Sequence, residues 1–201
     1  MGYQPLSAAA VVRLKERLGR YVAHDDPAAA LVNLVALVVA GNGPLYPLWV
    51  VAFTGHDGWI SLVTMGATPF FFAIPWLMRR SSVLGRLAIP VVGTLNTVWC
   101  TKLFGASSSV GLFFLPILLL ACLLYRRRER ALLLLALAFP FAASFIPERL
   151  YGLPIASFTA GEIESLAALN LGSVIMLMAF LAWQFAALLA QFAGAAKSAK
   201  D

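Results

Sequence analysis

The chain has 201 residues, of which 61% are hydrophobic and 12% are charged, and its formal net charge is +6. This composition lies far outside that of a soluble globular domain and predicts an all-α polytopic membrane protein. Apolar segments of about 20 residues, the length that crosses a bilayer, use almost the whole chain and leave no room for a soluble catalytic domain. The basic residues lie at the edges of these segments, where anionic lipid attracts them, so we expect no nucleic-acid partner.

Residues 1–26 are predicted to form a cytoplasmic segment, because polar, basic and acidic residues alternate there and no cleavable signal peptide is recognisable. Apolar side chains recur at three- and four-residue spacing, at Val11, Leu14, Leu18 and Val22. This spacing predicts an amphipathic helix over residues 7–22 that lies at the membrane surface, with packing on a partner domain as the alternative. Asp26 and Pro27 then predict the start of the next helix.

Six apolar segments follow and are predicted to cross the membrane as helices within a domain of residues 27–193. Their approximate ranges are 28–53, 59–78, 83–104, 110–125, 131–146 and 166–191. Residues 147–165 form a longer external connection, which has room for a short surface helix or a lid. Residues 194–201 are expected to form a short cytoplasmic tail.

The basic residues predict the orientation of these spans. Thirteen of the fifteen Lys and Arg residues cluster within 13–20, 79–86, 126–130 and 197–200, at alternate ends of the apolar segments. Short loops rich in Lys and Arg stay on the cytoplasmic side during insertion. The sequence therefore predicts a protein of the bacterial inner membrane with six spans and both termini in the cytoplasm.

The sequence contains no recognisable enzymatic motif. The two histidines, His24 and His56, are predicted at opposite membrane faces, so they do not ligate one haem. Cys100 and Cys122 both lie in predicted spans, which disfavours a disulfide or a metal site. We expect no catalytic residue, no metal and no enzymatic activity, and the pattern leaves any cofactor open. A transporter is disfavoured because neither an internal repeat nor a charged pathway is visible.

The first span is interrupted between Gly41 and Pro47. Pro44 and Pro47 remove two backbone donors and disrupt the preceding turns, which leaves carbonyl groups free near the middle of the membrane. Such a break is tolerated only where protein or a cavity receives the freed groups. A packing kink and a ligand cavity are both compatible with this pattern.

The candidate ligand-binding residues are polar and aromatic side chains of the first and third spans: Asn42, Tyr46, Trp49, Asn96, Trp99 and Cys100. The last three are predicted to share one helix face. An apolar pocket with a few polar groups is typical of small-molecule sites, although ordinary helix packing uses the same residues. The predicted pocket is bounded by spans one, three and six.

Three motifs carry a resemblance to a known family. Span one contains Gly43-Pro44-Leu45-Tyr46 followed by Trp49, span three contains residues 95–97 (Leu-Asn-Thr), and span four opens with residues 111–116 and is closed by a basic run. Over about residues 25–190 this order resembles the six-span input modules of CqsS-type receptor histidine kinases and bacterial membrane nucleotide cyclases. The resemblance implies that a small apolar ligand is detected within the bundle and that span six passes the signal to a cytoplasmic effector.

The sequence departs from that family after span six, where no dimerisation helix, kinase or cyclase follows. We therefore expect a sensory or ligand-binding module whose effector is not part of this chain. The alternative is a non-catalytic accessory subunit of a larger bacterial membrane complex. The expected partners are the lipid bilayer, a small apolar ligand, and a second copy of the chain or a larger complex.

Overall fold

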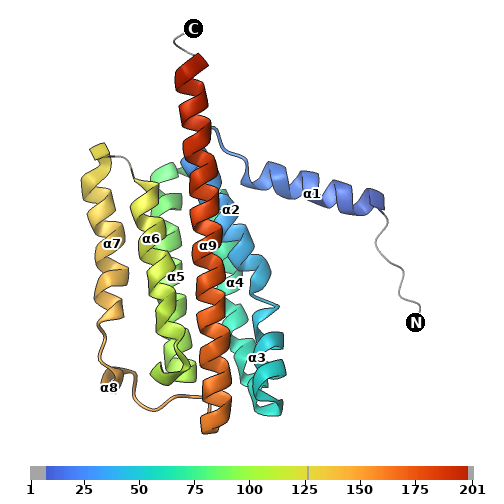
Figure 1. Cartoon of the computed structure of the whole chain (residues 1–201), viewed down its shortest axis with the longest axis vertical. Coiled ribbons are helices and arrows are strands. Elements are labelled where there is room, and N and C mark those ends of the chain that lie inside the picture. Colours follow the sequence, from blue (N-terminus) through green and yellow to red (C-terminus); the bar gives the residue numbers. More distant parts are fainter. Residues whose placement is uncertain (1–7, 126, 199–201) are drawn as a thin grey trace.

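The computed structural model describes residues 8–125 and 127–198, and every regular element in these ranges is a helix. The elements are α1 (Ala8–Val22), α2 (Pro27–Asn42), α3 (Tyr46–Thr54), η1 (His56–Ala67), α4 (Thr68–Arg80), α5 (Ser82–Phe104), η2 (Ala106–Ser108), η3 (Val110–Phe113), α6 (Phe114–Leu124), η4 (Arg127–Glu129), α7 (Arg130–Ser144), α8 (Glu148–Tyr151) and α9 (Ala160–Ser198). The long helices run side by side in a bundle, and α1 projects from one end of it (Figure 1). The predicted all-α class is confirmed.

Three helical segments are long and apolar enough to cross a membrane: Gly58–Arg80, α5, and Ala160–Ala190 of α9. The pair formed by α2 and α3 meets the same criterion together and is bent by 42° at its break, so it makes a fourth candidate. Val110–Leu124 and α7 are also apolar but shorter. The lengths and composition of these helices are compatible with a membrane protein, and three or four segments rather than six meet the spanning criterion.

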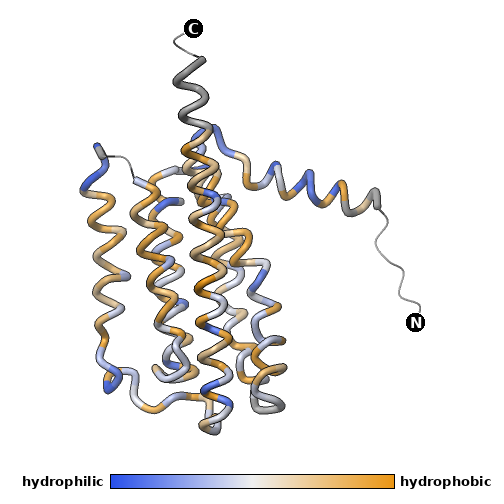
Figure 2. Tube along the Cα trace, viewed as in Figure 1, coloured by the Kyte–Doolittle hydropathy of each residue, from blue (hydrophilic) through white to orange (hydrophobic). Residues whose placement is uncertain are grey.

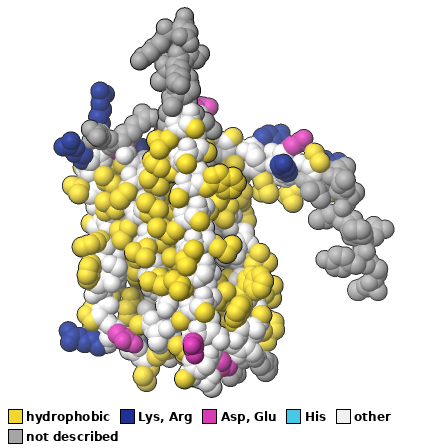
Figure 3. Space-filling view, in the orientation of Figure 1, with side chains coloured by type: hydrophobic (Ala, Val, Ile, Leu, Met, Phe, Trp, Pro, Cys, Tyr) yellow, Lys and Arg dark blue, Asp and Glu magenta, His cyan; other side chains and the backbone are white. Residues whose placement is uncertain are grey.

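Hydropathy varies along the bundle from its middle to its ends. Hydrophobic residues dominate the middle of the helices, and hydrophilic residues gather toward the two ends (Figure 2). The visible Lys and Arg side chains lie at the ends of the bundle and on α1, most of them at the end from which α1 projects (Figure 3). The apolar flank is the surface that lipid would cover.

The start of α2 follows its sequence signals. Asp26 has an extended backbone and its Oδ1 accepts a hydrogen bond of 3.0 Å from the Ala28 amide, while Pro27 occupies the first turn. The Asp26 side chain satisfies one of the free N–H groups in the first turn of the helix. Pro27 has no N–H group that would need a partner there. The predicted helix start at this position is confirmed.

The first half of span two, η1, is a 3-10 helix of 12 residues. The sequence pattern did not reveal this feature. Such runs rarely exceed four residues. Hydroxyl groups support it locally: Ser61 Oγ donates to the Gly58 carbonyl at 2.6 Å, and Thr64 Oγ1 donates to the Ser61 carbonyl at 2.7 Å. A Cβ at Gly58 would lie 2.8 Å from the Val51 Cα, so glycine allows η1 to pack closely on α3.

Two clusters of buried apolar residues hold the two halves of the bundle. The cluster nearer α1 joins α2, α4, α5, α6, α7 and α9 and includes Val32, Ile74 and Leu181. The cluster at the opposite end joins α3, α5, η3 and α9 and includes Val50, Phe104 and Leu166. Between the two clusters the helices of the bundle pack less completely, and this level contains the cavity described below.

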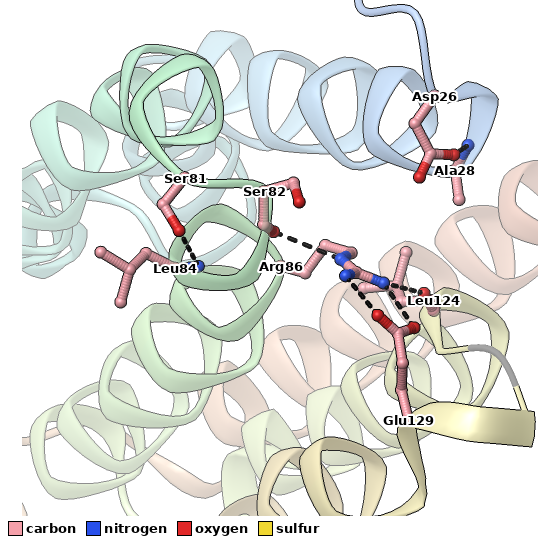
Figure 4. Close-up of polar contacts among 8 residues, drawn as sticks. All are labelled: Asp26, Ala28, Ser81, Ser82, Leu84, Arg86, Leu124 and Glu129. Atoms are coloured by element: carbon pink, nitrogen blue, oxygen red, sulfur yellow. Dashed lines mark hydrogen bonds and ion pairs between the residues drawn. The ribbon is translucent and has the colours of Figure 1, made fainter.

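Arg86 is buried inside α5, although the sequence places it with the basic residues of the second cytoplasmic cluster. Its Nη1 and Nη2 donate to the two carboxylate oxygens of Glu129 at 2.8 and 2.7 Å (Figure 4). Nη1 also donates to the Leu124 carbonyl and Nε to the Ser82 carbonyl, both at 3.2 Å. The guanidinium therefore ties α5 to the end of α6 and the start of α7.

The connection between α7 and α9 is attached to the opposite end of α5. Lys102 Nζ donates to the carbonyls of Tyr151 and Leu153 at 2.8 and 2.7 Å. The amide of Ala156 donates to the Leu103 carbonyl at 2.9 Å, and Ala156 itself is buried. The short helix α8 and the residues after it thus close this end of the bundle.

Candidate ligand-binding cavity

The break in span one lies between α2, which ends at Asn42, and α3, which begins at Tyr46. Its turn is closed by short-range bonds, from the Gly43 amide to the Ala40 carbonyl at 3.2 Å and from the Leu45 amide to the Asn42 carbonyl at 3.0 Å. Pro44 and the proline at position 47 cannot donate to the carbonyls one turn earlier, so the straight helix is lost. The predicted departure from a straight helix between Gly41 and Pro47 is confirmed.

Gly43 makes the break compact. A Cβ at this position would collide with the side-chain hydroxyl of Thr68, the first residue of α4. The turn therefore lies directly against the start of α4. The Thr68 hydroxyl is buried and makes no hydrogen bond within the described part of the chain.

A cavity of about 690 Å³ lies beside this break. That volume falls within the range of small-molecule binding sites. Most of its lining is apolar and comes from α2, α4, α5, α6 and α9, including Val39, Phe71, Ile89, Leu120, Leu177 and Phe180. The sequence predicted walls from spans one, three and six, and the structure places spans two and four in the wall as well.

A relay of hydrogen bonds closes the cavity on the side of α3 and α9. The Tyr46 hydroxyl donates to Asn170 Oδ1 at 2.9 Å, and Asn170 Nδ2 donates to the Ser108 carbonyl at 2.9 Å. Asn170 is fully buried. Both ends of the Asn170 amide group therefore have protein partners. Tyr46 lines the cavity, and its hydroxyl proton is already donated to Asn170.

Asn96 and Cys100 supply polar groups from α5. The Cys100 Sγ lies 3.8 Å from Asn96 Oδ1, a weak hydrogen bond that leaves the Asn96 amide N–H groups without a protein acceptor among the described residues. By contrast, the hydroxyls of Thr97 and Ser173 donate to carbonyls of their own helices, at 2.9 and 2.8 Å. Asn96, together with the exposed Asn42, is therefore available to contact a molecule in the cavity.

Five of the six candidate residues line the cavity: Asn42, Tyr46, Trp49, Asn96 and Cys100. The sixth, Trp99, does not line it and is 41% exposed. Asn96 and Cys100 lie one above the other on α5, whereas Trp99 is turned by about 100° from Cys100 around the helix axis. The expected common face therefore holds two of the three residues.

The six candidate residues include none from spans two and four, although Thr68 and Phe71 at the start of α4 line the cavity. Both are ordinary residues of an apolar segment, and only the packing of α4 against the break brings them to the cavity. Within the described chain, the residues that line this cavity carry no charged side chain.

The fold is an all-helical bundle of apolar helices, and a cavity lined by uncharged residues lies beside the break between α2 and α3. No protein-family model, curated protein or solved structure matches the chain.

Proposed function

We propose that the chain is a membrane-embedded sensory module that binds a small, uncharged and largely apolar molecule and signals to a cytoplasmic effector outside this chain. The observation that carries the proposal is the cavity of about 690 Å³ beside the broken first span. A ligand site explains why space for a small molecule lies beside the break, whereas a packing kink does not require it.

The chemistry of the lining selects the ligand. A charged molecule would lose its hydration without gaining an opposite charge, which is strongly unfavourable. An apolar molecule gains from burial against side chains such as Phe71 and Leu120. The amides of Asn42 and Asn96 then fix its orientation through one or two hydrogen bonds.

The proposed topology has six spans in the bacterial inner membrane, with both termini in the cytoplasm. The apolar helix α7 has 15 residues, a length of about 23 Å at 1.5 Å per residue. A bilayer core of about 30 Å must thin locally around α7 and Val110–Leu124 if both are to span it. The gathering of Lys and Arg at one end of the bundle supports the proposed orientation (Figure 3).

Helix α1 is proposed to lie on the cytoplasmic membrane surface. It leaves the bundle at the end where most visible Lys and Arg gather, and it runs away from the bundle at a steep angle to the long helices (Figures 1 and 3). Val12, Leu14 and Leu18 are exposed on it. A helix in this position buries its apolar side chains in the interface while its basic side chains meet the headgroups.

The route of the signal is proposed to be α9, which has 39 residues. Ser173, Leu177 and Leu181 of this helix line the cavity, and the helix continues past the cavity to Ser198. A ligand that repacks these three side chains would shift or rotate the continuous helix, which carries the displacement to the effector side.

Photolabelling tests the proposal. The probe is a 12-carbon aliphatic alcohol that carries a diazirine, applied to the purified protein in phosphatidylcholine nanodiscs. We expect saturable labelling of cavity-lining peptides of α5 and α9, which excess unlabelled 12-carbon alcohol suppresses. Asn96→Leu removes a hydrogen-bonding group and is expected to weaken the saturable labelling about tenfold. Leu95→Ala is the matched control, because Leu95 is exposed on the same helix.

Labelling that does not saturate, or that Asn96→Leu and Leu95→Ala alter equally, would contradict the sensory proposal. Copurification from native membranes at a fixed stoichiometry with a larger assembly, together with unsaturable labelling, would favour the accessory subunit instead.

A further inference from the structure

The end of α1 is attached to α4 at two points. The Tyr21 hydroxyl donates to the Phe72 carbonyl at 2.6 Å. In return, Arg79 Nη2 donates to the Tyr21 carbonyl at 3.4 Å, and the Arg79 guanidinium carbon lies 4.7 Å from the centre of the Tyr21 ring. These contacts fix the corner between the two helices, and they hold one arginine of the bundle beside the arginines of α1.

This corner contains a shallow pocket of about 300 Å³ lined by Arg17, Arg20, Tyr21 and Arg79. Three arginine side chains thus line one space, and no carboxylate lines it among the residues that the structure describes. Arg17 and Arg20 are exposed and form no ion pair with any described residue. Like charges held together repel one another, so an anion in the pocket would relieve the repulsion. Guanidinium groups bind phosphate through paired, charge-assisted hydrogen bonds.

The surroundings of the pocket are apolar and match a lipid rather than a free anion. On α4, Phe72, Trp76 and Arg79 follow one another at four- and three-residue spacing, which places them along one helix face. Phe72 and Trp76 are both exposed. A molecule whose phosphate lies among the arginines can therefore extend an acyl chain along these two rings, whereas inorganic phosphate makes no use of them.

Helix α1 also presents exposed apolar side chains. Leu14 and Leu18 are exposed and lie beside the arginine face of the helix. If α1 lies on the membrane surface as proposed above, these leucines enter the acyl region, and the pocket falls at the level of the lipid headgroups. Basic pockets between membrane helices on the cytoplasmic side are suited to anionic headgroups.

We infer that this corner, the Arg17/Arg20/Arg79 pocket, is a binding site for one anionic phospholipid of the cytoplasmic leaflet. Its phosphate lies among the three guanidinium groups, and an acyl chain covers Phe72 and Trp76. The site is separate from the cavity beside the broken span, and the inference rests only on the surface position proposed for α1.

The test measures lipid binding to the purified protein in neutral maltoside detergent by native mass spectrometry. Dioleoyl phosphatidylglycerol is the anionic probe and dioleoyl phosphatidylcholine the zwitterionic one. We expect the protein to retain phosphatidylglycerol at least tenfold more tightly. Each arginine near a lipid surface contributes about a fivefold change in affinity, so Arg17→Gln/Arg20→Gln is expected to weaken phosphatidylglycerol binding about 30-fold.

The control is Lys15→Gln/Arg128→Gln, which removes the same charge from exposed positions outside the pocket. It is expected to change phosphatidylglycerol binding less than about threefold. Both double variants alter exposed side chains, and thiol accessibility of the buried Cys100 verifies that each one is folded.

Equal losses in the two double variants would show diffuse attraction to anionic lipid and would overturn the inference. Displacement of phosphatidylglycerol by inorganic phosphate at equal concentration would show a free-anion site and would overturn it as well. Neither result changes the photolabelling of the cavity, so failure of this inference is distinguishable from failure of the proposed function.

Discussion

The ion pair between Arg86 and Glu129 offers the sharpest test of how the end of the bundle near α1 is held. We predict that Glu129→Leu is strongly destabilising, whereas Arg86→Met/Glu129→Leu recovers much of the loss. The single substitution leaves the Arg86 guanidinium buried without its carboxylate, and only the carbonyls of Ser82 and Leu124 continue to accept from it. The double substitution removes the buried charge together with its partner.

The magnitude follows from the burial of the pair. The side chains of Arg86 and Glu129 are 6% and 25% exposed, and their closest N–O distance is 2.7 Å. Removal of one partner from a buried pair costs about 3–5 kcal/mol. Because Glu129 is partly exposed and two carbonyl acceptors remain, we expect the lower end, about 3 kcal/mol. The coupling energy between the two positions is expected to reach about 2 kcal/mol.

The two cysteines provide the assay. Cys100 is buried and Cys122 is exposed, so in a Cys122→Ser background a fluorogenic maleimide reports the unfolding of the bundle through Cys100 alone. Titration of sodium dodecyl sulfate into mixed micelles then yields the free energy of unfolding. Glu148→Gln is the control, because Glu148 is exposed on α8, and it is expected to change stability by less than about 0.5 kcal/mol.

Two outcomes would refute the reasoning. If Glu129→Leu cost no more than Glu148→Gln, the pair would behave as an exposed surface ion pair. If the double variant were as unstable as the sum of the two single variants, the guanidinium and the carboxylate would not depend on each other.

Three further predictions concern the topology and the cavity. Single cysteines at Arg80 and Arg128 are expected to react with an impermeant maleimide from the cytoplasmic side only, and external labelling of either would overturn the orientation. Tyr46→Phe leaves a buried amide oxygen of α9 without its donor and is expected to cost about 1–2 kcal/mol in the unfolding titration. Gly43→Ala places a methyl group onto the Thr68 hydroxyl, so it is expected to destabilise by about 1–3 kcal/mol, and Thr68→Ala in the same chain should recover part of that loss.

The local features of the first span could be predicted because they arise from neighbouring residues. Asp26 and Pro27 start α2 through backbone groups within one turn. Pro44 and Pro47 break the span because proline lacks an N–H wherever the chain places it. Neither effect depends on a distant helix, so both were visible in the sequence.

The candidate site was predictable only in part. Asn96 and Cys100 share a helix face by spacing alone, and both line the cavity. Whether Trp99 joined them depended on how α5 is rotated against its neighbours, which the spacing does not fix. Thr68 and Phe71 enter the wall only because Gly43 allows α4 to approach the break.

The sequence by itself determined the helical class, the apolar segments and the break, since composition and local chemistry fix these properties. Only the tertiary structure decided which faces of the helices surround the cavity. It buried Arg86, which the sequence groups with other basic residues, and paired it with Glu129. It also brought Arg79 of α4 beside Arg17 and Arg20 of α1. These outcomes depend on rotation and approach between helices far apart in the chain, and no local pattern specifies such quantities.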